Sequence, residues 1–339
     1  MPNDIYYAVA HRSQKEIDSF KDRYANFDTE AIPLIFKKVL HLTATSWNPS
    51  STWGTSHVIY EVNVKERNNP LILRANLGIS EPEKVMKVEQ LITDKVSKLG
   101  VNTNRVLYAD VSRVLVPFDF QIQEKLEGKD PERFFTGTKK EYDAYSFATG
   151  QCIAKISQLQ FKKFGRFDGD AADKEKLLGT KSTFPDYIFT MLQEDISKLT
   201  KFGLLTEHSS KQILKIFEEY IPVMEISRGS LVHHDLADHN LLIDDQHRFA
   251  GIFDWEAAVV GDPVLDLASC PTWTSLYPKE EQLIEGFRSI ATLPDHFKEK
   301  MNIYRLRTML WKGVFYVRAH LVNEKRLAVF QNALKPFKL

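Results

Sequence analysis

The 339-residue chain is poor in cysteine and contains no long uninterrupted apolar run. Its two cysteines, Cys152 and Cys270, lie far apart and form no C-x-x-C pair. This excludes a disulfide framework or a cysteine-rich metal site and is typical of a reducing compartment. No segment approaches the length of a membrane span, and the N-terminus lacks the basic-then-apolar pattern of a signal peptide. We therefore expect a soluble, cytoplasmic protein with no membrane partner.

The chain also lacks net charge, because 45 lysines and arginines balance 45 aspartates and glutamates. A basic excess is typical of proteins that bind nucleic acid or anionic membranes, so the balance gives no support for either partner. Internal repeats and low-complexity tracts are missing as well. The length and a hydrophobic content of 43% are sufficient for two lobes with their own cores. The sequence carries no signal for the oligomeric state.

The most informative stretch covers residues 231–266 and reads LVHHDLADHNLLIDDQHRFAGIFDWEAAVVGDPVLD. His233, Asp235 and Asn240 follow the pattern H-x-D-x4-N, and Asp254 comes after thirteen further residues. The apolar runs LLID and RFAGIF predict a hairpin with its turn at 245–247. Such a hairpin would bring Asn240 beside Asp254.

These residue types suit phosphoryl transfer. A phosphoryl donor carries concentrated negative charge and needs a divalent cation, which prefers oxygen ligands such as those of Asn240 and Asp254. A hydroxyl acceptor needs a carboxylate within reach of its proton, and Asp235 can serve as that general base. The sequence therefore predicts Asp235 as the catalytic residue and Asn240 and Asp254 as Mg²⁺ ligands. His233 and Asp266 are interpreted as residues that brace the loop.

The stretch resembles the catalytic loop of eukaryotic-type kinases and, more closely, that of the aminoglycoside phosphotransferase family of small-molecule kinases. Ala237 stands where protein kinases usually carry a lysine, and Trp255-Glu256 replaces Phe-Gly after Asp254. The G-D-P-x-x-D-L-A tail at 261–268 is typical of the phosphotransferases. His239 departs from the small residue that usually precedes the asparagine.

The resemblance implies a bilobal α/β (α+β) protein-kinase-like fold. Residues 1–126 would form a small N-terminal nucleotide-binding lobe with an antiparallel sheet. Residues 127–339 would form a larger, mainly helical C-terminal lobe, with a helical insertion at about 139–221 that walls the acceptor pocket. Helices are expected at 138–160, 185–200, 207–221, 279–290 and 295–322, and strands at 41–47, 57–65, 70–76, 105–108 and 113–123.

Several residues of the N-terminal lobe are candidates for nucleotide binding. Alternation along 70–76 places Arg74 in the middle of an apolar strand, and Glu89 lies within the apolar stripe of the helix at 81–99. A buried acid invites a cationic partner. The resemblance to kinase-like folds implies that the cation of the third strand is this partner, so we pair Glu89 with Arg74. By resemblance, Arg74 would position phosphates, and Ser56 in the segment GTSHVIY would donate to their oxygens, with His57 replacing the usual asparagine. The resemblance also places adenine contacts on the backbone of Glu124 and Leu126.

The implied reaction moves the γ-phosphoryl group of ATP or GTP, with Mg²⁺, to a hydroxyl of a small molecule. Acceptors in the family include aminoglycosides, macrolides, choline and amino-sugar adducts. A cationic acceptor is favoured by the acidic segment 168–175 and by Asp238, Glu256 and Asp262. Two alternatives stay open: a non-catalytic nucleotide-binding relative, and a metallohydrolase built on His233, His234, Asp235, Asp238 and His239.

Overall fold

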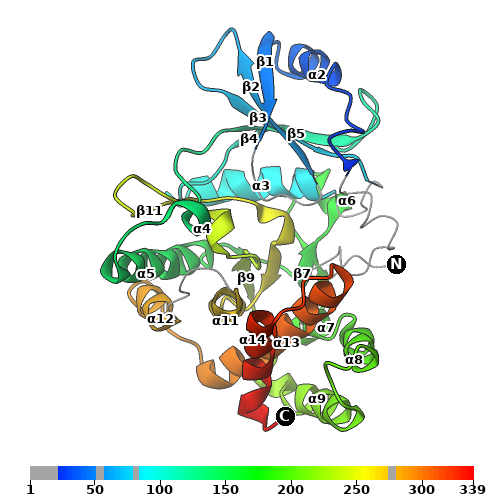
Figure 1. Ribbon diagram of the computed structural model, residues 1–339, viewed down its shortest axis with the longest axis vertical. Coiled ribbons are helices and arrows are strands. Elements are labelled where there is room, and N and C mark those ends of the chain that lie inside the picture. Colours follow the sequence, from blue (N-terminus) through cyan, green and yellow to red (C-terminus); the bar gives the residue numbers. More distant parts are fainter. Residues whose placement is uncertain (1–21, 51–56, 79–83, 274–279) are drawn as a thin grey trace.

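Alternating apolar side chains organise the first lobe into an antiparallel sheet of five strands in the order β1-β2-β3-β5-β4. The computed structural model describes residues 22–50, 57–78, 84–273 and 280–339. The strands are β1 (Ala44–Pro49), β2 (Val58–Val64), β3 (Leu71–Asn76), β4 (Val106–Asp110) and β5 (Asp119–Glu124). Helix α2 (Ala31–Val39) packs near β1 at the top of the molecule (Figure 1).

Strand β3 and helix α3 (Val85–Ser97) hold the two charged residues expected inside this lobe. In β3, Leu71, Leu73 and Ala75 enter the apolar core of the sheet, so Arg74 is on the opposite face, as the alternation predicts. Figure 1 shows α3 beneath the sheet, between it and the second lobe. Glu89 is on this helix and only 1% exposed.

The strand expected from Arg113 begins only at Asp119, so this prediction is wrong at its N-terminal end. Arg113 adopts a positive φ of 57°, which a strand does not allow. The N–H of Ser112 donates to the Asp110 carboxylate at 2.7 Å, which closes a turn. Val114 is 88% exposed, whereas Val116 and Phe118 are buried, so the segment contributes to the core without forming a strand.

A short segment crosses from β5 to the second lobe. It follows Glu124 and ends at helix α4 (Pro131–Phe134), which Asp130 caps through the N–H of Glu132. Lys129 and Ile243 exchange two backbone hydrogen bonds of 2.9 Å each, which ties the crossing to the second lobe. The lobe boundary proposed after Leu126 falls within this segment.

The second lobe is mainly helical, as expected. Its helices, apart from α4, are α5 (Lys139–Ile156), α6 (Gly169–Ala172), α7 (Phe184–Ile188), α8 (Leu192–Lys201), α9 (Glu207–Glu219), α10 (Ile221–Met224), α11 (Val264–Ser269), α12 (Glu280–Arg288), α13 (Phe297–Arg318) and α14 (Glu324–Leu334). The helix expected at 185–200 is in fact two, α7 and α8, because Met191 has a positive φ of 58°.

A sheet in the second lobe was not predicted. Its strands are β6 (Gln160–Phe161), β7 (Phe164–Phe167), β8 (Gly179–Lys181), β9 (Gly229–Val232) and β12 (Val259–Gly261), in the order β6-β9-β12-β7-β8. Each has two to four residues, too few to show a period of two. Strands β9 and β12 pair directly and fix both ends of the 233–258 segment.

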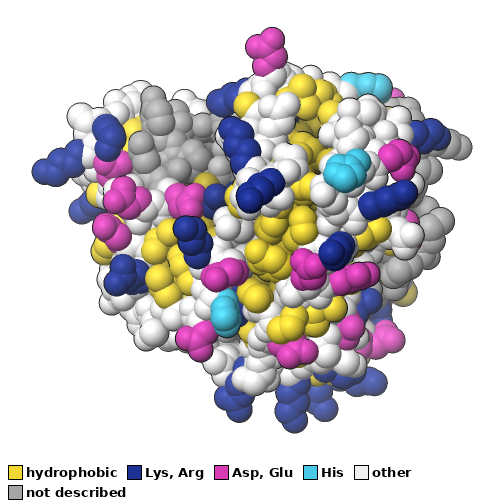
Figure 2. All heavy atoms as spheres, turned by 90° about the horizontal axis from the view of Figure 1, so that it is seen from below, with side chains coloured by type: hydrophobic (Ala, Val, Ile, Leu, Met, Phe, Trp, Pro, Cys, Tyr) yellow, Lys and Arg dark blue, Asp and Glu magenta, His cyan; other side chains and the backbone are white. Residues whose placement is uncertain are grey.

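The helices and one face of the surface can be compared with the composition of the sequence. None of the helices within the described ranges is long and apolar enough to cross a membrane. On the face seen from below, Lys and Arg side chains lie interspersed with Asp and Glu, with apolar areas between them (Figure 2).

Helices α5 and α12 approach each other at two glycines. A Cβ atom on Gly150 would lie 2.1 Å from the Leu283 carbonyl oxygen, and one on Gly286 would lie 1.9 Å from that of Phe147. Both obstacles are backbone atoms, which cannot rotate away. This contact supports α5, whose other end carries Tyr142 and Tyr145 beside the candidate active site.

We predict that Gly286→Ala lowers the free energy of unfolding by roughly 1–3 kcal/mol, because it overpacks this interface. Urea unfolding followed by circular dichroism measures the change. The matched control is Gly313→Ala in α13, where a Cβ would meet only the ends of the Leu199 and Phe330 side chains. An equal effect at both positions would contradict the proposed backbone contact.

Candidate active site

A buried carboxylate holds the loop that carries Asp235 from behind. Asp266 in α11 is 0% exposed and accepts the N–H groups of His233 at 2.9 Å and His234 at 2.7 Å. Burial raises the pKa of Asp266 to about 7, although the two N–H groups oppose the shift. His234 has a positive φ of 69°, a strained conformation that these bonds maintain. The predicted bracing role of Asp266 is confirmed.

The ring of His233 links the loop to the segment around Asp254. Its Nδ1 accepts the N–H of Asp235 at 3.3 Å, so its Nε2 is the donor to the Phe253 carbonyl oxygen at 3.0 Å. Burial lowers the pKa of His233 to about 4, which agrees with a neutral ring in these contacts. The ring also packs against Trp255, with centroids 4.6 Å apart. The predicted structural role of His233 is therefore confirmed.

The predicted hairpin brings Asn240 and Asp254 to the same place. Strands β10 (Leu241–Ile243) and β11 (Phe249–Ile252) pair with Leu241 opposite Ile252, and the Phe253 N–H donates to the Asn240 carbonyl oxygen at 3.1 Å. The Asn240 amide nitrogen donates to the backbone oxygen and the carboxylate of Asp235, at 2.9 and 3.0 Å. The amide oxygen is therefore the atom of this side chain that can bind a cation.

Arg74 and Glu89 form the ion pair that the sequence predicts. The Arg74 Nη1 lies 3.0 and 2.8 Å from the two Glu89 carboxylate oxygens, and both side chains are buried. Glu89 also accepts the N–H of Trp255 at 3.0 Å, so it connects α3 to the second lobe. The other terminal nitrogen, Nη2, lies 3.2 Å from an Asp254 carboxylate oxygen and hydrogen-bonds to Glu256.

Three carboxylates thus surround one guanidinium. Burial raises the pKa of Glu89 to about 7 and that of Asp254 to about 6, although Arg74 opposes both shifts. Burial alone would raise the pKa of Glu256, but Arg74 and His57 outweigh it and hold that pKa low. Burial disfavours the charged form of Arg74, yet the three carboxylates raise its pKa. The cluster therefore carries an excess of negative charge.

The excess of negative charge in this cluster is suited to binding a divalent cation. Asp254 and Asn240 present carboxylate and amide oxygens, the donors that Mg²⁺ prefers. Burial and the nearby carboxylates of Glu256 and Asp235 raise the pKa of Asp254 against the effect of Arg74. A bound cation would offset the charge of Asp254, so these residues fit the metal that the family resemblance implies.

The sequence did not predict that Glu256 contacts Arg74. Its carboxylate also lies 2.7 Å from the Nε2 of His57, at the start of β2, and its backbone oxygen accepts from Arg166 in β7 at 2.9 Å. Only the D-W-E sequence could have indicated it, because its partners are far away in the chain. Ser56, the other candidate at this loop, lies outside the described residues.

The two candidates for adenine contacts lie in the crossing between the lobes. The Glu124 N–H already donates to the Arg105 carbonyl oxygen at 2.8 Å, so Glu124 could offer a base only its own carbonyl oxygen. Leu126 is half-buried and approaches Gly251 of β11. Their binding role stays a prediction.

The metallohydrolase alternative has no support. The His234 Nδ1 faces the Tyr187 hydroxyl at 3.2 Å, whereas His239 faces Glu132 at 3.1 Å. Asp238 accepts from Tyr142 at 2.8 Å and Tyr145 at 3.2 Å. Across the described ranges, no three His, Cys, Asp or Glu side chains are grouped so that they could hold a metal.

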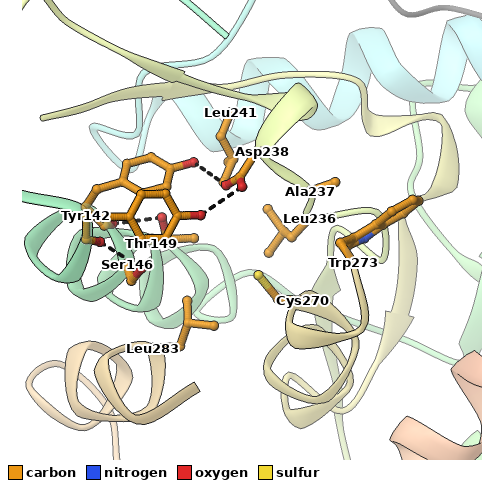
Figure 3. A pocket seen from close by; sticks show the side chains of 11 residues that line it. Tyr142, Ser146, Thr149, Leu236, Ala237, Asp238, Leu241, Cys270, Trp273 and Leu283 are labelled. Carbon is orange, nitrogen blue, oxygen red and sulfur yellow. Dashed lines mark hydrogen bonds between the residues drawn. The ribbon is translucent and has the colours of Figure 1, made fainter. Parts of the chain in front are cut away.

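Most of the carboxylates expected to favour a cationic acceptor are engaged within the protein. Asp238 lines a small cavity of about 20 Å³, and Figure 3 shows Tyr142 of α5 pointing at the Asp238 carboxylate. Asp262 is 1% exposed and pairs with Lys300 at 2.7 Å. In the segment 168–175, the acids pair with lysines of the α3 region: Asp170 and Asp173 with Lys84, and Glu175 with Lys87. These residues therefore give no support for a cationic acceptor.

Comparisons with known proteins agree with this geometry. The sequence model of the phosphotransferase enzyme family matches residues 52–290. A "Probable ketoamine kinase" of Klebsiella aerogenes is 34% identical over 98 residues, which are 29% of this chain and 32% of that protein. The chain thus matches about a third of that relative's length.

Solved structures share the fold over nearly the whole chain. The streptomycin–ATP–APH(2″)-IIa ternary complex has a TM-score of 0.60 at 17% identity and covers 91% of this chain and 96% of its own. The GDP complex of an aminoglycoside 2′-phosphotransferase-IIIa mutant has a TM-score of 0.62 at 17% identity and covers 91% and 95%. At this identity the likeness shows the fold, and the expected bilobal kinase-like architecture is confirmed.

We predict that Glu89→Ala lowers the free energy of unfolding by roughly 3–5 kcal/mol, because it leaves the buried Arg74 cation without its main partner. Urea unfolding measures the loss. The control is Glu124→Gln, which removes an exposed ion pair with Arg67 and should cost at most about 1 kcal/mol. Similar losses in both variants would contradict the central position of the buried pair.

Proposed function

The chain belongs to the phosphotransferase enzyme family, and we propose that it transfers the γ-phosphoryl group of ATP or GTP to a hydroxyl group of a small molecule. One observation carries the proposal. Asp235, Asn240 and Asp254 converge beside the buried Arg74–Glu89 pair. A carboxylate base, two oxygen ligands and a fixed cation are the groups that this transfer needs.

Each residue has a distinct part in the proposed reaction. Asp235 accepts the proton of the acceptor hydroxyl, and the Asn240 amide keeps its carboxylate oriented. Asn240 and Asp254 would hold Mg²⁺, which supplies charge neutralisation at the phosphate oxygens. Glu89 fixes the guanidinium of Arg74 at the phosphate end of the site. Because the protein forms no covalent intermediate, positioning and electrostatics supply most of the acceleration.

The acceptor class rests on the relatives. The curated relative carries the name of a ketoamine kinase, and the first solved structure contains streptomycin. A ketoamine, the adduct of a sugar with an amine, is therefore the first acceptor to test, and an aminoglycoside is the second. Fold alone does not decide between them.

A non-catalytic nucleotide-binding relative is the second candidate. The observation in its favour is His57, which replaces the usual asparagine and is bound to the Glu256 carboxylate at 2.7 Å. The retained Asp235, Asn240 and Asp254 argue for catalysis. Nucleotide binding without turnover on any acceptor would favour this second candidate.

We predict that Asp235→Asn lowers the turnover number by roughly 10²–10⁴-fold while nucleotide affinity stays within about twofold, because only the proton acceptor is lost. The measurement is ATP and GTP consumption with Mg²⁺ on a panel of ketoamines, aminoglycosides, macrolides and amino alcohols. The matched control is Asp245→Asn in the exposed turn of the hairpin, which pairs with Lys129 and should retain full activity. Equal turnover in Asp235→Asn and wild type would sink the assignment of the base.

A further inference from the structure

The guanidinium of Arg74 faces carboxylates at both terminal nitrogens. Nη1 is held by Glu89, and Nη2 is shared between Asp254 and Glu256. A residue that binds phosphate oxygens needs N–H groups directed at them. Phosphate oxygens can therefore bind these two terminal nitrogens only if one of the carboxylate partners gives way.

Two of the three partners are fixed. Glu89 is 1% exposed and is also held by the Trp255 N–H at 3.0 Å and by the Gln121 amide at 3.2 Å. Asp254 is the proposed metal ligand, and its place is set by the hairpin that positions Asn240. Neither carboxylate can leave without dismantling the site.

Glu256 differs from both. Its side chain is 37% exposed, whereas that of Arg74 is 6% exposed. Its backbone is fixed, because its carbonyl oxygen accepts from Arg166 at 2.9 Å. The side chain can therefore turn towards solvent by rotation about its own bonds, without any movement of the chain.

The same carboxylate oxygen of Glu256 also binds His57. Its distance to the His57 Nε2 is 2.7 Å, and His57 precedes β2, next to the loop that resembles the phosphate-binding loop of the family. One carboxylate thus binds two side chains that carry N–H groups, His57 next to β2 and Arg74 in β3. A phosphate group has the charge and the acceptor oxygens to take the same two partners.

We propose that Glu256 is a positioning residue that occupies Arg74 and His57 in the nucleotide-free enzyme and yields them to phosphate oxygens of the nucleotide. It keeps both side chains in place before binding, and it competes with the phosphates when they arrive. Nucleotide affinity is consequently lower than the site would otherwise provide. This inference rests on the proposed function, because it requires a nucleotide in this cleft.

The test measures ADP binding by isothermal titration calorimetry in the presence of EDTA, so that no metal contributes. Wild type is compared with Glu256→Gln, which keeps the shape of the side chain and removes its charge. We expect the variant to bind ADP roughly threefold to tenfold more tightly, because one like charge beside the phosphates is lost. The matched control is Glu280→Gln, which removes a similarly exposed ion pair with Arg305 away from the cleft and should leave affinity unchanged.

If thermal unfolding shows that Glu256→Gln does not fold, Glu256→Asp provides a second test of the same inference. The shorter side chain keeps the charge but cannot reach Arg74 and His57 together, so ADP should again bind more tightly than in wild type. Unchanged or weaker ADP binding in the folded variants overturns the inference. If the variants also bind Mn²⁺ more weakly than wild type, Glu256 is a metal ligand instead. If wild type itself binds neither ADP nor Mg²⁺-ATP, the proposed function fails instead.

Discussion

The buried ion pair between Arg74 and Glu89 is the interaction on which the site depends. It fixes strand β3 to helix α3 inside the first lobe. Through the Trp255 N–H and the Asp254 carboxylate, it also reaches the first residues after the hairpin of the second lobe. Burying two charges is costly unless they are paired and hydrogen-bonded, and here each charge has several partners. One pair therefore links the two lobes beside the candidate active site.

The second constraint is the support beneath the catalytic loop. Asp266 holds the backbone at His233 and His234, while Asp262 is buried with Lys300 and Tyr304. The conspicuous acids of the G-D-P-x-x-D-L-A tail therefore serve the fold and do not face an acceptor. The proposed chemistry uses Asp235, Asn240 and Asp254, which the hairpin and the Asn240 amide bring together.

The sequence predicted what depends on regular periods or local spacing. Alternation in β3 and the stripe of α3 placed Arg74 and Glu89 at buried positions, and the resemblance to kinase-like folds paired them. Two apolar runs were enough to place Asn240 near Asp254. The short strands of the second lobe were missed because two to four residues show no period. The contact between His57 and Glu256 joins residues 199 positions apart, so no local pattern could reveal it.

The most direct test of the account is a crystal structure with a non-hydrolysable ATP analogue and Mn²⁺, in which anomalous scattering locates the metal. We predict a metal peak within roughly 2.0–2.3 Å of oxygen atoms of both Asp254 and Asn240, with the phosphates beside Arg74. The acceptor side of the γ-phosphate should face the Asp235 carboxylate. A metal peak away from Asp254, or a nucleotide bound outside the cleft between the lobes, would contradict the account.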